Sequence, residues 1–486
     1  MVKVSIIIPV CGQSHYTKKC LETLFKYTPK DLFEVIIVNN NSPDDTAEML
    51  KEFDVKVITN DMNKSFAISI NQGVNESSGE YILALNNDIE FYQPWLKEML
   101  ETFSDRKVGV VGAQMLFKDG TLQHAGVACY KNRQPYHVFR GEEPSEKTNR
   151  MVEYPAVSFA CALFKRSLFE SLQGLSVEYP DGNFEDVDFC LRARLKRWKN
   201  IYQPKAKLYH LEAGTKKLDP KRAKKAIFDN YEIFKKQWEH SPQRLFDVDR
   251  ELFPKILVGC PTYDKYEYCL KQYGLIVKNL MYPNYDILLV DNSEEINYKH
   301  LLDIEHIPSD HIDYEKKARD RIVLSRNILR KKALKYDYFL SLEQDVIPEP
   351  SIIQDLLKLN KKIVSGAYFN NVKLQNGDII LKPVLYKFHE KKGFWGTCRL
   401  MTKDEVWAEG VQEVAYAGLG CMLIAKEVLE KIKFRYSEKM DATDDRFFCY
   451  DARKLGYDIF ADTGIKAKHL IADKFDWDDL REKGEY

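Results

Sequence analysis

The sequence predicts an α/β protein built from two tandem copies of one domain, each a mostly parallel sheet flanked by helices. Two observations lead to this prediction. Short apolar runs of strand length alternate with segments of helical periodicity from the N-terminus onward, as in parallel sheets. The whole series then restarts roughly midway along the 486 residues, with its polar landmarks in the same order.

Four apolar runs in the first half have the length and polar boundaries of buried strands. Two segments between them carry apolar residues at helical spacing, which predicts helices that pack one face against the sheet. The expected strands are 4–10, 35–38, 55–59 and 81–85, and the expected helices are 16–27 and 66–76. The second half repeats this series with expected strands at 255–260, 287–290 and 338–342.

The distance between matching residues of the two halves changes little along the chain. It is 252 residues for Pro9 and Pro261, 257 for Asp88 and Asp345, and 259 for His210 and His469. Three cysteine pairs also correspond: Cys20 with Cys269, Cys161 with Cys421, and Cys190 with Cys449. Chance similarity between two unrelated α/β domains is the alternative, and the preserved order of the polar ends disfavours it.

The boundary between the copies is expected after a basic helical stretch at 216–240. The next segment, 241–254, contains two prolines and is assigned to a linker, so the domains are 1–240 and 255–486. The Lys/Arg cluster at 216–225 favours a solvated helix face, with contact to anionic lipid or a phosphate-bearing acceptor as the alternative.

Composition excludes several classes of protein. Lys+Arg and Asp+Glu both total 73, so the basic excess of a dedicated nucleic-acid binder is missing. No apolar run reaches the ~18 residues of a membrane span, and the N-terminus is interpreted as a strand rather than a signal peptide. We therefore expect a cytoplasmic protein, with peripheral contact at the inner face of the membrane left open.

Known short motifs narrow the function further. The ten cysteines form no CxxC pair, so free and mostly buried thiols are expected. The sequence also lacks a P-loop, a GxGxxG after a strand and a GxSxG elbow. These absences disfavour an ATPase, a Rossmann oxidoreductase and an α/β-hydrolase.

Polar residues follow the apolar strands, where ligands of parallel sheets bind. The runs that begin at Asn39 and Asp291 offer acceptors for a nucleobase N–H, or form Asx turns. Asp88 and Asp345 end two further strands; each can hold a divalent cation on a diphosphate, or cap a helix.

A third cluster combines paired acids with a later histidine. Asp186 precedes His210 by 24 residues, and Asp445 precedes His469 by the same 24. A single histidine is more often a satisfied structural residue. Two at one spacing, each after an apolar strand, favour a second metal ligand and a general base.

These segments together resemble glycosyltransferase family 2, which has the GT-A fold. The resemblance spans 1–215 and rests on VSIIIPV at 4–10, VNNNS at 38–42, NKSF at 63–66, NQG at 71–73, LNND at 85–88, EDVDFCLR at 185–192 and His210. The second half resembles a more divergent member, with CPT at 260–262, VDNS at 290–293, EQD at 343–345, DDRFFC at 444–449 and His469. The chain is thus similar to a tandem glycosyltransferase.

The resemblance implies inverting, metal-dependent transfer from a nucleotide diphospho-sugar to a glycan, lipid-linked or protein acceptor. It implies catalytic roles for Asp186 as general base with Glu185, and for Asp445 with Asp444. It implies that Mn²⁺ or Mg²⁺ is held by Asp88 and His210, and by Asp345, His469 and Glu343. Donor contacts are implied for Pro9, Val10, Asn39, Asn63, Asn71, Asn87, Pro261, Asp291 and Asn327.

The sequence departs from the family pattern at three informative places. Asn39 stands where many relatives have Asp, and Asn86 replaces the first acid of the DxD motif. In the second half, Asp451 stands where Arg192 does in the first. The alternative function is therefore one active N-terminal domain with a noncatalytic second domain that binds an acceptor or a partner.

Overall fold

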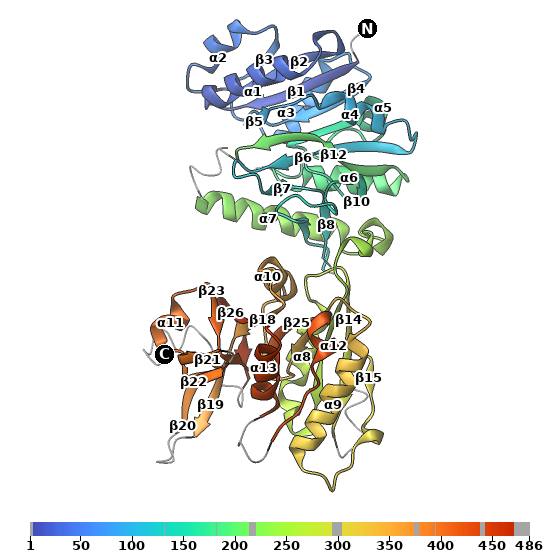
Figure 1. The fold of residues 1–486 in the computed structure, drawn as a ribbon. Coiled ribbons are helices and arrows are strands. Elements are labelled where there is room, and N and C mark those ends of the chain that lie inside the picture. Colours follow the sequence, from blue (N-terminus) through green and yellow to red (C-terminus); the bar gives the residue numbers. More distant parts are fainter. Residues whose placement is uncertain are drawn as a thin grey trace. The chain divides into compact units, whose positions relative to one another are not determined.

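The computed structural model describes residues 3–130, 132–180, 182–212, 220–293, 304–373, 379–393, 395–437 and 443–470. The chain divides into two compact units, Met1–Asp249 and Arg250–Tyr486, which we call the first and the second unit (Figure 1). This division lies inside 241–254, the segment assigned to the linker from the sequence. The assignment of each unit to a glycosyltransferase domain stays a prediction at this level.

The first unit is built on one mixed sheet. Strand order is β10-β12-β6-β11-β4-β1-β2-β3, and β11 runs antiparallel to both of its neighbours. Strands β4-β1-β2-β3 run parallel, as the apolar runs predicted, and β6 also pairs in parallel with β12. The strands are β1 (Val4–Val10), β2 (Phe33–Asn40), β3 (Lys56–Asn60), β4 (Tyr81–Leu85), β6 (Val108–Leu116), β10 (Val152–Tyr154), β11 (Cys161–Lys165) and β12 (Lys199–His210), with β5 (Ile89–Phe91) on β12 and β7 (Leu122–His124) on β6.

The second unit repeats this topology position by position. Its sheet has the order β23-β26-β18-β25-β16-β13-β14-β15, with β25 again antiparallel to both neighbours. The strands are β13 (Ile256–Thr262), β14 (Tyr285–Asp291), β15 (His306–Ile307), β16 (Tyr338–Leu342), β18 (Ile363–Ala367), β23 (Val411–Val414), β25 (Cys421–Ala425) and β26 (Ile459–Lys466). The internal repeat found in the sequence is therefore a repeat of architecture as well.

Shorter strands complete both units. They are β8 (Val127–Cys129) with β9 (Pro135–His137), β17 (Val346–Ile347) with β27 (Lys468–His469), β19 (Phe369–Lys373) with β20 (Ile379–Pro383), and β21 (Leu385–Lys392) between β22 (Trp395–Leu400) and β24 (Tyr416–Ala417).

Helices cover both faces of each sheet because alternate strand residues point to opposite faces. In β1, Ile6 and Ile8 join the core beneath α1 and α4, whereas Ile7 faces α3. Gly73 of α3 lies so close that an added Cβ would come within 2.3 Å of Ile7 Cγ2, so the approach requires glycine. The helices of this unit are α1 (Ser14–Tyr27), α2 (Thr46–Met49), α3 (Phe66–Asn75), α4 (Leu96–Thr102), α5 (Arg166–Ser171), α6 (Glu185–Leu195) and α7 (Pro220–Trp238).

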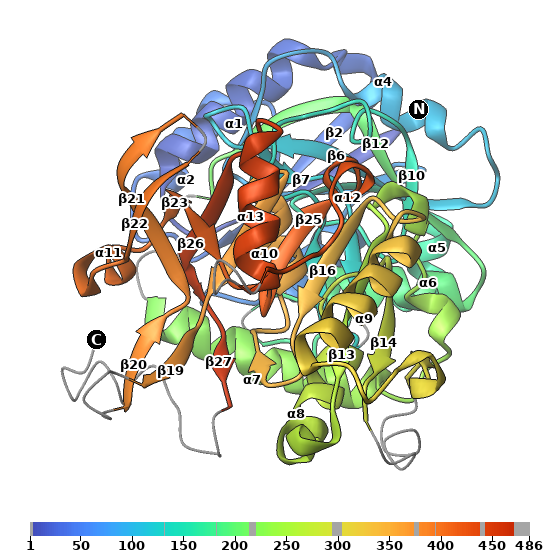
Figure 2. The same ribbon diagram turned by 60° about the horizontal axis from the view of Figure 1, so that its bottom comes forward.

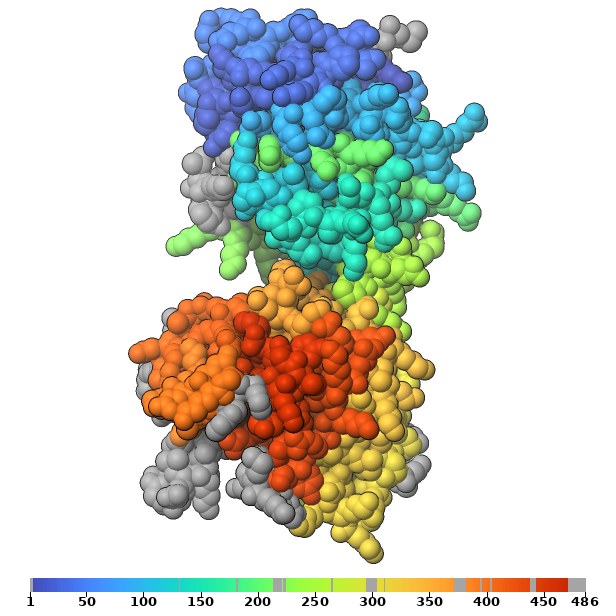
Figure 3. All heavy atoms as spheres, in the orientation of Figure 1, coloured from blue at the N-terminus to red at the C-terminus, as the bar shows by residue number. Residues whose placement is uncertain are grey.

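In the second unit, α9 lies along β13 and β14 (Figure 2). Leu329 of α9 and Phe448 of α13 belong to one apolar core under the sheet. The surface of this unit includes the red region formed by α12 and α13 (Figure 3). The helices are α8 (Glu267–Lys278), α9 (Ala318–Ala333), α10 (Ile352–Lys358), α11 (Lys403–Trp407), α12 (Lys426–Lys431) and α13 (Asp444–Lys454).

Two further expectations can be compared with this structure. All ten cysteines are free and eight of them are buried, which confirms the expectation of unpaired thiols. Within the described residues, none of the helices combines the length and the apolarity that crossing a bilayer requires. The predicted helix at 216–240 is present as α7, and residues 216–219 lie outside the described residues.

Candidate active sites

In each unit, a polar side chain at the end of the second central strand forms a local turn. Asn39 Oδ1 accepts hydrogen bonds from Ser42 N at 3.1 Å and Ser42 Oγ at 2.7 Å. Asp291 Oδ1 accepts from Ser293 N at 2.9 Å and Ser293 Oγ at 2.6 Å. The Asx-turn alternative thus describes both loops as they stand, and the nucleobase role of Asn39 and Asp291 stays a prediction.

The donor-side prolines lie directly beside these turns. Pro9 pairs in register with Val38, and Val10 with Asn39. Pro261 pairs with Val290 in the same way, next to Asp291. The structure therefore brings Pro9, Val10 and Asn39 together, and likewise Pro261 and Asp291, at the carboxyl edge of each sheet.

The predicted metal ligands meet in pairs, although more than 120 residues of chain separate them. In the first unit, His210 Nε2 lies 3.3 Å from Asp88 Oδ1, and both side chains are buried. In the second unit, His469 Nε2 lies 2.9 Å from Asp345 Oδ2. The pairing of β5 with β12, and of β17 with β27, puts each histidine opposite the residue that follows the aspartate.

The first pair fits a divalent cation. His210 Nε2 faces the Asp88 carboxylate and the Asn86 amide, while its buried Nδ1 contacts no hydrogen-bond partner among the described residues. A carboxylate oxygen and an imidazole nitrogen that face each other in this way can both serve as ligands of one metal ion. Mixed carboxylate–imidazole ligation suits Mn²⁺, and a phosphate-bound cation needs only one or two protein carboxylates.

The second pair is closed by additional contacts. His469 Nδ1 lies 2.6 Å from the Phe369 carbonyl oxygen, to which it donates, and Nε2 is directed at Asp345. Burial lowers the pKa of His469, but the hydrogen bond and the charge of Asp345 outweigh it, so the pKa is raised. The two ring nitrogens of His469 thus contact Phe369 and Asp345 at the same time, and the metal role of this pair stays a prediction.

The paired acids begin a helix in both units. Asp186 Oδ1 accepts from Val187 N at 2.8 Å, and Oδ2 accepts from Phe159 N at 3.3 Å. Ala160 follows Phe159, and its carbonyl oxygen accepts a hydrogen bond from Asn86 N at 2.9 Å. This bond links the loop that contacts Asp186 to the loop that contains Asp88. Asp445 Oδ1 accepts from Arg446 N at 2.7 Å, and burial followed by the charge of Asp444 raises the Asp445 pKa.

Two asparagines predicted to contact the donor instead join a helix to a distant loop. Asn71 donates to the Leu175 carbonyl and accepts from Leu175 N, both at 3.0 Å. Asn327 makes the same pair of bonds with Phe434, at 2.8 and 3.1 Å. The Nδ2 and Oδ1 atoms of each asparagine therefore bind the same distant residue, and the donor-binding role of both asparagines stays a prediction that this geometry disfavours.

The other predicted donor contacts are placed differently. Asn87 donates to Thr17 Oγ1 at 2.9 Å, so its side chain ties the β4 loop to α1. Asn63 is exposed in the loop before α3, and its donor role stays a prediction. Glu343, assigned as an extra metal ligand, lies 2.5 Å from Arg326 Nη2 instead.

The sequence did not lead to a role for Arg326, although this residue lies within one of the matched segments. The matched tripeptides 69–71 and 325–327 align Arg326 with Ile70. In the structure this buried guanidinium also forms an ion pair with Asp444 at 2.5 Å. The signal in the sequence was a charged residue at a position where the other copy has a buried aliphatic one.

Asp188 was also missed, although it lies within the segment that carried the resemblance. It is fully buried, and its Oδ2 accepts from Arg192 Nε at 2.7 Å. Its Oδ1 accepts from Gln237 Nε2 at 2.8 Å and from the Trp238 indole at 3.2 Å. Asp188 thus holds the end of α7 against α6 and serves the fold.

A groove of about 580 Å³ opens beside His210. Its lining includes Phe117, Thr121 and Leu211, so it approaches the candidate metal pair from the β6–β7 side. His124 Nε2 accepts a hydrogen bond from Ser158 N at 3.3 Å. Burial holds the pKa of His124 well below its usual value. His124 is therefore a buried residue that packs within the fold.

Comparison with known proteins identifies the first unit. Residues 5–173 match the family model described as glycosyl transferase family 2. Residues 5–173 are a glycosyltransferase family 2 domain. The matched span of this family 2 domain includes Asp88 and ends before Asp186 and His210. The roles of all three residues stay predictions.

Relatives of the family 2 domain include several curated proteins. The chain is 30% identical over 249 residues to an uncharacterized protein of Sinorhizobium fredii (49% of this chain, 27% of that protein). It is 31% identical over 228 residues to the O-antigen biosynthesis protein RfbC of Myxococcus xanthus (45% and 18%). It is 24% identical over 216 residues to the GalNAc(5)-diNAcBac-PP-undecaprenol beta-1,3-glucosyltransferase of Campylobacter jejuni (43% and 63%). In each case the match spans less than two thirds of the relative.

Solved structures give weaker likenesses. A mannosyltransferase of Pyrobaculum calidifontis with GDP-Man and Mn²⁺ aligns at 16% identity and a TM-score of 0.34, over 44% of this chain and 59% of that one. TarS of S. aureus with UDP-GlcNAc aligns at 19% identity and 0.34, over 44% and 59%. Scores this low do not establish a shared fold, so the family 2 domain rests on its own sequence match.

Proposed function

We propose that the protein is a glycosyltransferase that moves a sugar from a nucleotide diphospho-sugar to a hydroxyl group of a glycan or lipid-linked acceptor. The observation that carries this proposal is the family 2 match of residues 5–173, whose sheet edge holds the Asp88–His210 pair. The names of two relatives, for O-antigen biosynthesis and for glucosylation of an undecaprenol-linked glycan, support the acceptor class. A protein acceptor stays the less supported choice.

In the proposed reaction Asp186 is the general base of the first unit. The acceptor hydroxyl gives its proton to a carboxylate oxygen of Asp186, which requires a separation of about 2.6–3.2 Å. The acceptor oxygen forms a bond to the anomeric carbon, and the bond from that carbon to the phosphate oxygen breaks with inversion. The nucleoside diphosphate leaves with the bonding electrons. Backbone hydrogen bonds from Val187 and Phe159 hold the Asp186 carboxylate in place, and Glu185 is proposed to orient the acceptor.

Asp88 and His210 would hold Mn²⁺ or Mg²⁺ at the diphosphate. The bound ion supplies positive charge opposite the leaving group. The residues themselves prepare that position, because β5 and β12 fix the two side chains relative to each other. Asn86 keeps a neutral amide beside His210 Nε2, so the first unit adds no second carboxylate at this loop.

In the fuller form of the proposal, the second unit is a second transferase with Asp445 as base and Asp444 beside it. The shared strand order of the two sheets supports this form. The alternative is a noncatalytic second unit that binds acceptor or partner. The contact of Arg326 with both Glu343 and Asp444 favours that alternative, because it occupies two of the acids assigned to the site.

A donor screen with matched variants tests the proposal. UDP- and GDP-sugars are offered with Mn²⁺ to wild type, Asp186→Asn and Asp445→Asn, with the exposed Asp31→Asn as the control for an Asp-to-Asn change. Loss of a general base costs about 10²–10⁴-fold in rate, so Asp186→Asn should lose a transfer that Asp31→Asn keeps. Full activity of the Asp186→Asn variant would show that Asp186 is not the general base. Unchanged transfers in Asp445→Asn would leave one active unit.

Metal removal gives an independent test of Asp88 and His210. A chelator should abolish the Asp186-dependent transfer, and added Mn²⁺ or Mg²⁺ should restore it in wild type. Asp88→Asn should need a higher Mn²⁺ concentration for half-maximal rate, because one of two proposed ligands is gone. Transfer that persists in the chelator would contradict a metal role for this pair.

A further inference from the structure

The second unit carries a buried positive charge under its sheet edge. Arg326 lies in α9, and its side chain is 8% exposed. It follows Ser325 and precedes Asn327, just as Ile70 follows Ser69 and precedes Asn71. The equivalent bonds of Asn71 to Leu175 and of Asn327 to Phe434 show that the two helices present these positions in the same way.

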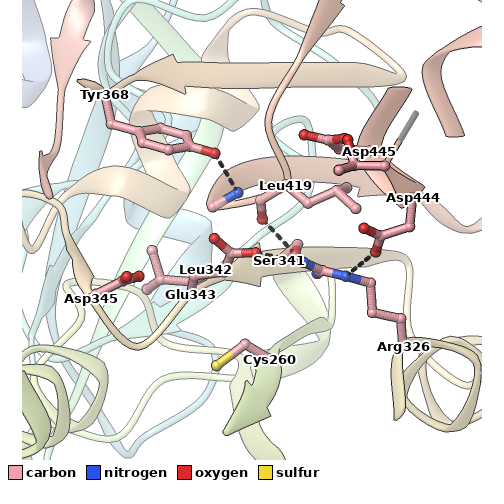
Figure 4. A network of polar contacts seen from close by, with 12 residues as sticks. Cys260, Arg326, Ser341, Leu342, Glu343, Asp345, Tyr368, Leu419, Asp444 and Asp445 are labelled. Carbon is pink, nitrogen blue, oxygen red and sulfur yellow. Dashed lines mark hydrogen bonds and ion pairs between the residues drawn. The ribbon is translucent and has the colours of Figure 1, made fainter. Parts of the chain in front are cut away.

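All three guanidinium nitrogens of Arg326 face acceptors of the same unit (Figure 4). Nη2 lies 2.5 Å from Glu343 Oε1, and Nε lies 2.5 Å from Asp444 Oδ2. Nη1 donates to Ser341 Oγ at 3.4 Å, and Ser341 Oγ donates to the Leu419 carbonyl at 2.6 Å. The guanidinium therefore bridges the β16 loop and the first turn of α13, the two places that supply the acids of this site.

The first unit has no such bridge at the equivalent residues. Ile70 stands for Arg326, Asn86 for Glu343 and Glu185 for Asp444. The three positions carry one negative charge in the first unit, and two negative charges with one positive charge in the second. The net charge is the same, but in the second unit both carboxylates are bound to a fixed cation.

We propose that Arg326, by its ion pairs with Glu343 and Asp444, prevents these two carboxylates from binding a divalent metal ion. The second unit then binds Mn²⁺ more weakly than the first. A carboxylate that accepts from a guanidinium at 2.5 Å has that oxygen occupied, and the positive charge repels a second cation nearby. Arg326 acts as a positioning residue: it holds the β16 loop and α13 together without contributing to the chemistry. The proposal rests on the proposed function only in treating this sheet edge as the donor site.

Binding of Mn²⁺ alone to the full chain tests this proposal, with free Mn²⁺ followed by electron paramagnetic resonance. Asp88→Asn weakens the site of the first unit, so that it stays empty at the Mn²⁺ concentration used, and Arg326→Gln is then added to this variant. The double variant should gain one Mn²⁺ equivalent that Asp88→Asn lacks, and a further Asp345→Asn change should remove it. Arg326→Lys in place of Gln keeps the cation and should gain none.

Two results would overturn the proposal. One is Asp345-dependent Mn²⁺ binding in Asp88→Asn as strong as that of the first unit in wild type. The other is a folded Asp88→Asn/Arg326→Gln chain, shown by circular dichroism, that gains no Mn²⁺ site.

The reciprocal exchange covers the case in which Arg326→Gln does not fold. Ile70→Arg/Asn86→Glu copies the bridge into the first unit and should weaken its Mn²⁺ binding at least tenfold. Unchanged affinity in a folded Ile70→Arg/Asn86→Glu chain would also overturn the proposal. Sugar transfer is measured separately, so failure of the proposed function and failure of this inference are distinguishable.

Discussion

At the scale of single residues, an asparagine that lies in a ligand-binding motif can instead form hydrogen bonds that stabilise the fold. Asn71 belongs to the NQG segment that carried the family resemblance, yet both Nδ2 and Oδ1 of its side chain form hydrogen bonds with Leu175. Asn327 bonds to Phe434 in the same manner. An amide that donates and accepts at once suits a backbone segment as well as it suits a nucleotide. Stability measurements can separate the two roles.

We predict that Asn71→Ala destabilises the first unit. The change leaves the backbone N–H and C=O of Leu175 without their partner, which costs about 1–3 kcal/mol of unfolding free energy for buried groups. Urea unfolding measures this loss. Asn75→Ala, on the exposed end of the same helix, should change stability by about 0.5 kcal/mol or less. A drop in donor affinity with unchanged stability would instead support the nucleotide role of Asn71.

At the scale of elements, α7 is fastened to the first unit at its C-terminal end. Phe234 and Trp238 are buried, whereas Ile227 and Phe228 of the same helix are exposed. The apolar residues of α7 are therefore only partly used for packing against the first unit. The buried polar anchor is Asp188, which accepts from Gln237 and Trp238 while it pairs with Arg192.

We predict that Asp188→Ala releases the end of α7. Breaking a buried ion pair costs roughly 3–5 kcal/mol of unfolding free energy. Because Arg192 is partly exposed, we expect a loss of about 3 kcal/mol. Hydrogen exchange should become faster across 232–238. Asp229→Ala, which removes only an exposed pair with Lys225, should leave that exchange unchanged. Equal protection in Asp188→Ala and wild type would contradict the anchoring role.

At the scale of the whole molecule, the second unit contains a histidine whose pKa is raised by its aspartate partner. The raised pKa of His469 means that the protonated imidazole is favoured in the folded second unit. A raised pKa adds stability below the unfolded value of ~6.5, and this stability is lost as pH rises through the folded pKa. The second unit should therefore become less stable above about pH 6.5 from this pair.

Calorimetry in a chelator measures this effect. The transition of the second unit should move to lower temperature as the pH is raised from about 6.5, and His469→Gln should flatten the dependence. His240→Gln, at an exposed histidine in the first unit, is the matched control and should leave the slope unchanged. A transition that rises with pH over this window would contradict the ion-pair interpretation.

The sequence predicted the framework well because strands and helices depend on local patterns. The bounds of β1, β4 and β16 agree with their apolar runs, and α3 begins at the predicted Phe66. The family resemblance implied that Asp88 and His210 act together, and the structure places Asp88, in the turn after β4, 3.3 Å from His210 at the end of β12. GT-A chemistry for the second unit was inferred from the same landmarks and stays a prediction.

What the sequence could not predict depends on contacts across long separations. Leu175 lies 104 residues from Asn71, and Phe434 lies 107 residues from Asn327. No local pattern records such partners, so both asparagines were assigned to the donor. Arg326 was visible as a departure between the two copies, but its meaning required the positions of Glu343 and Asp444 around it.

The shared strand order of the two units has a consequence for folding. Two sheets with the same succession of strands in one chain offer each central strand a competing neighbour in the other copy. Wrong pairing between repeats is a characteristic failure of multidomain chains, and folding of the N-terminal domain during synthesis limits it. The last strand of the first sheet ends at His210, before β13 begins at Ile256. During synthesis, the strands of the second unit therefore appear only after all strands of the first sheet have been made. Refolding of the denatured full chain removes that temporal separation and exposes both copies to each other at once.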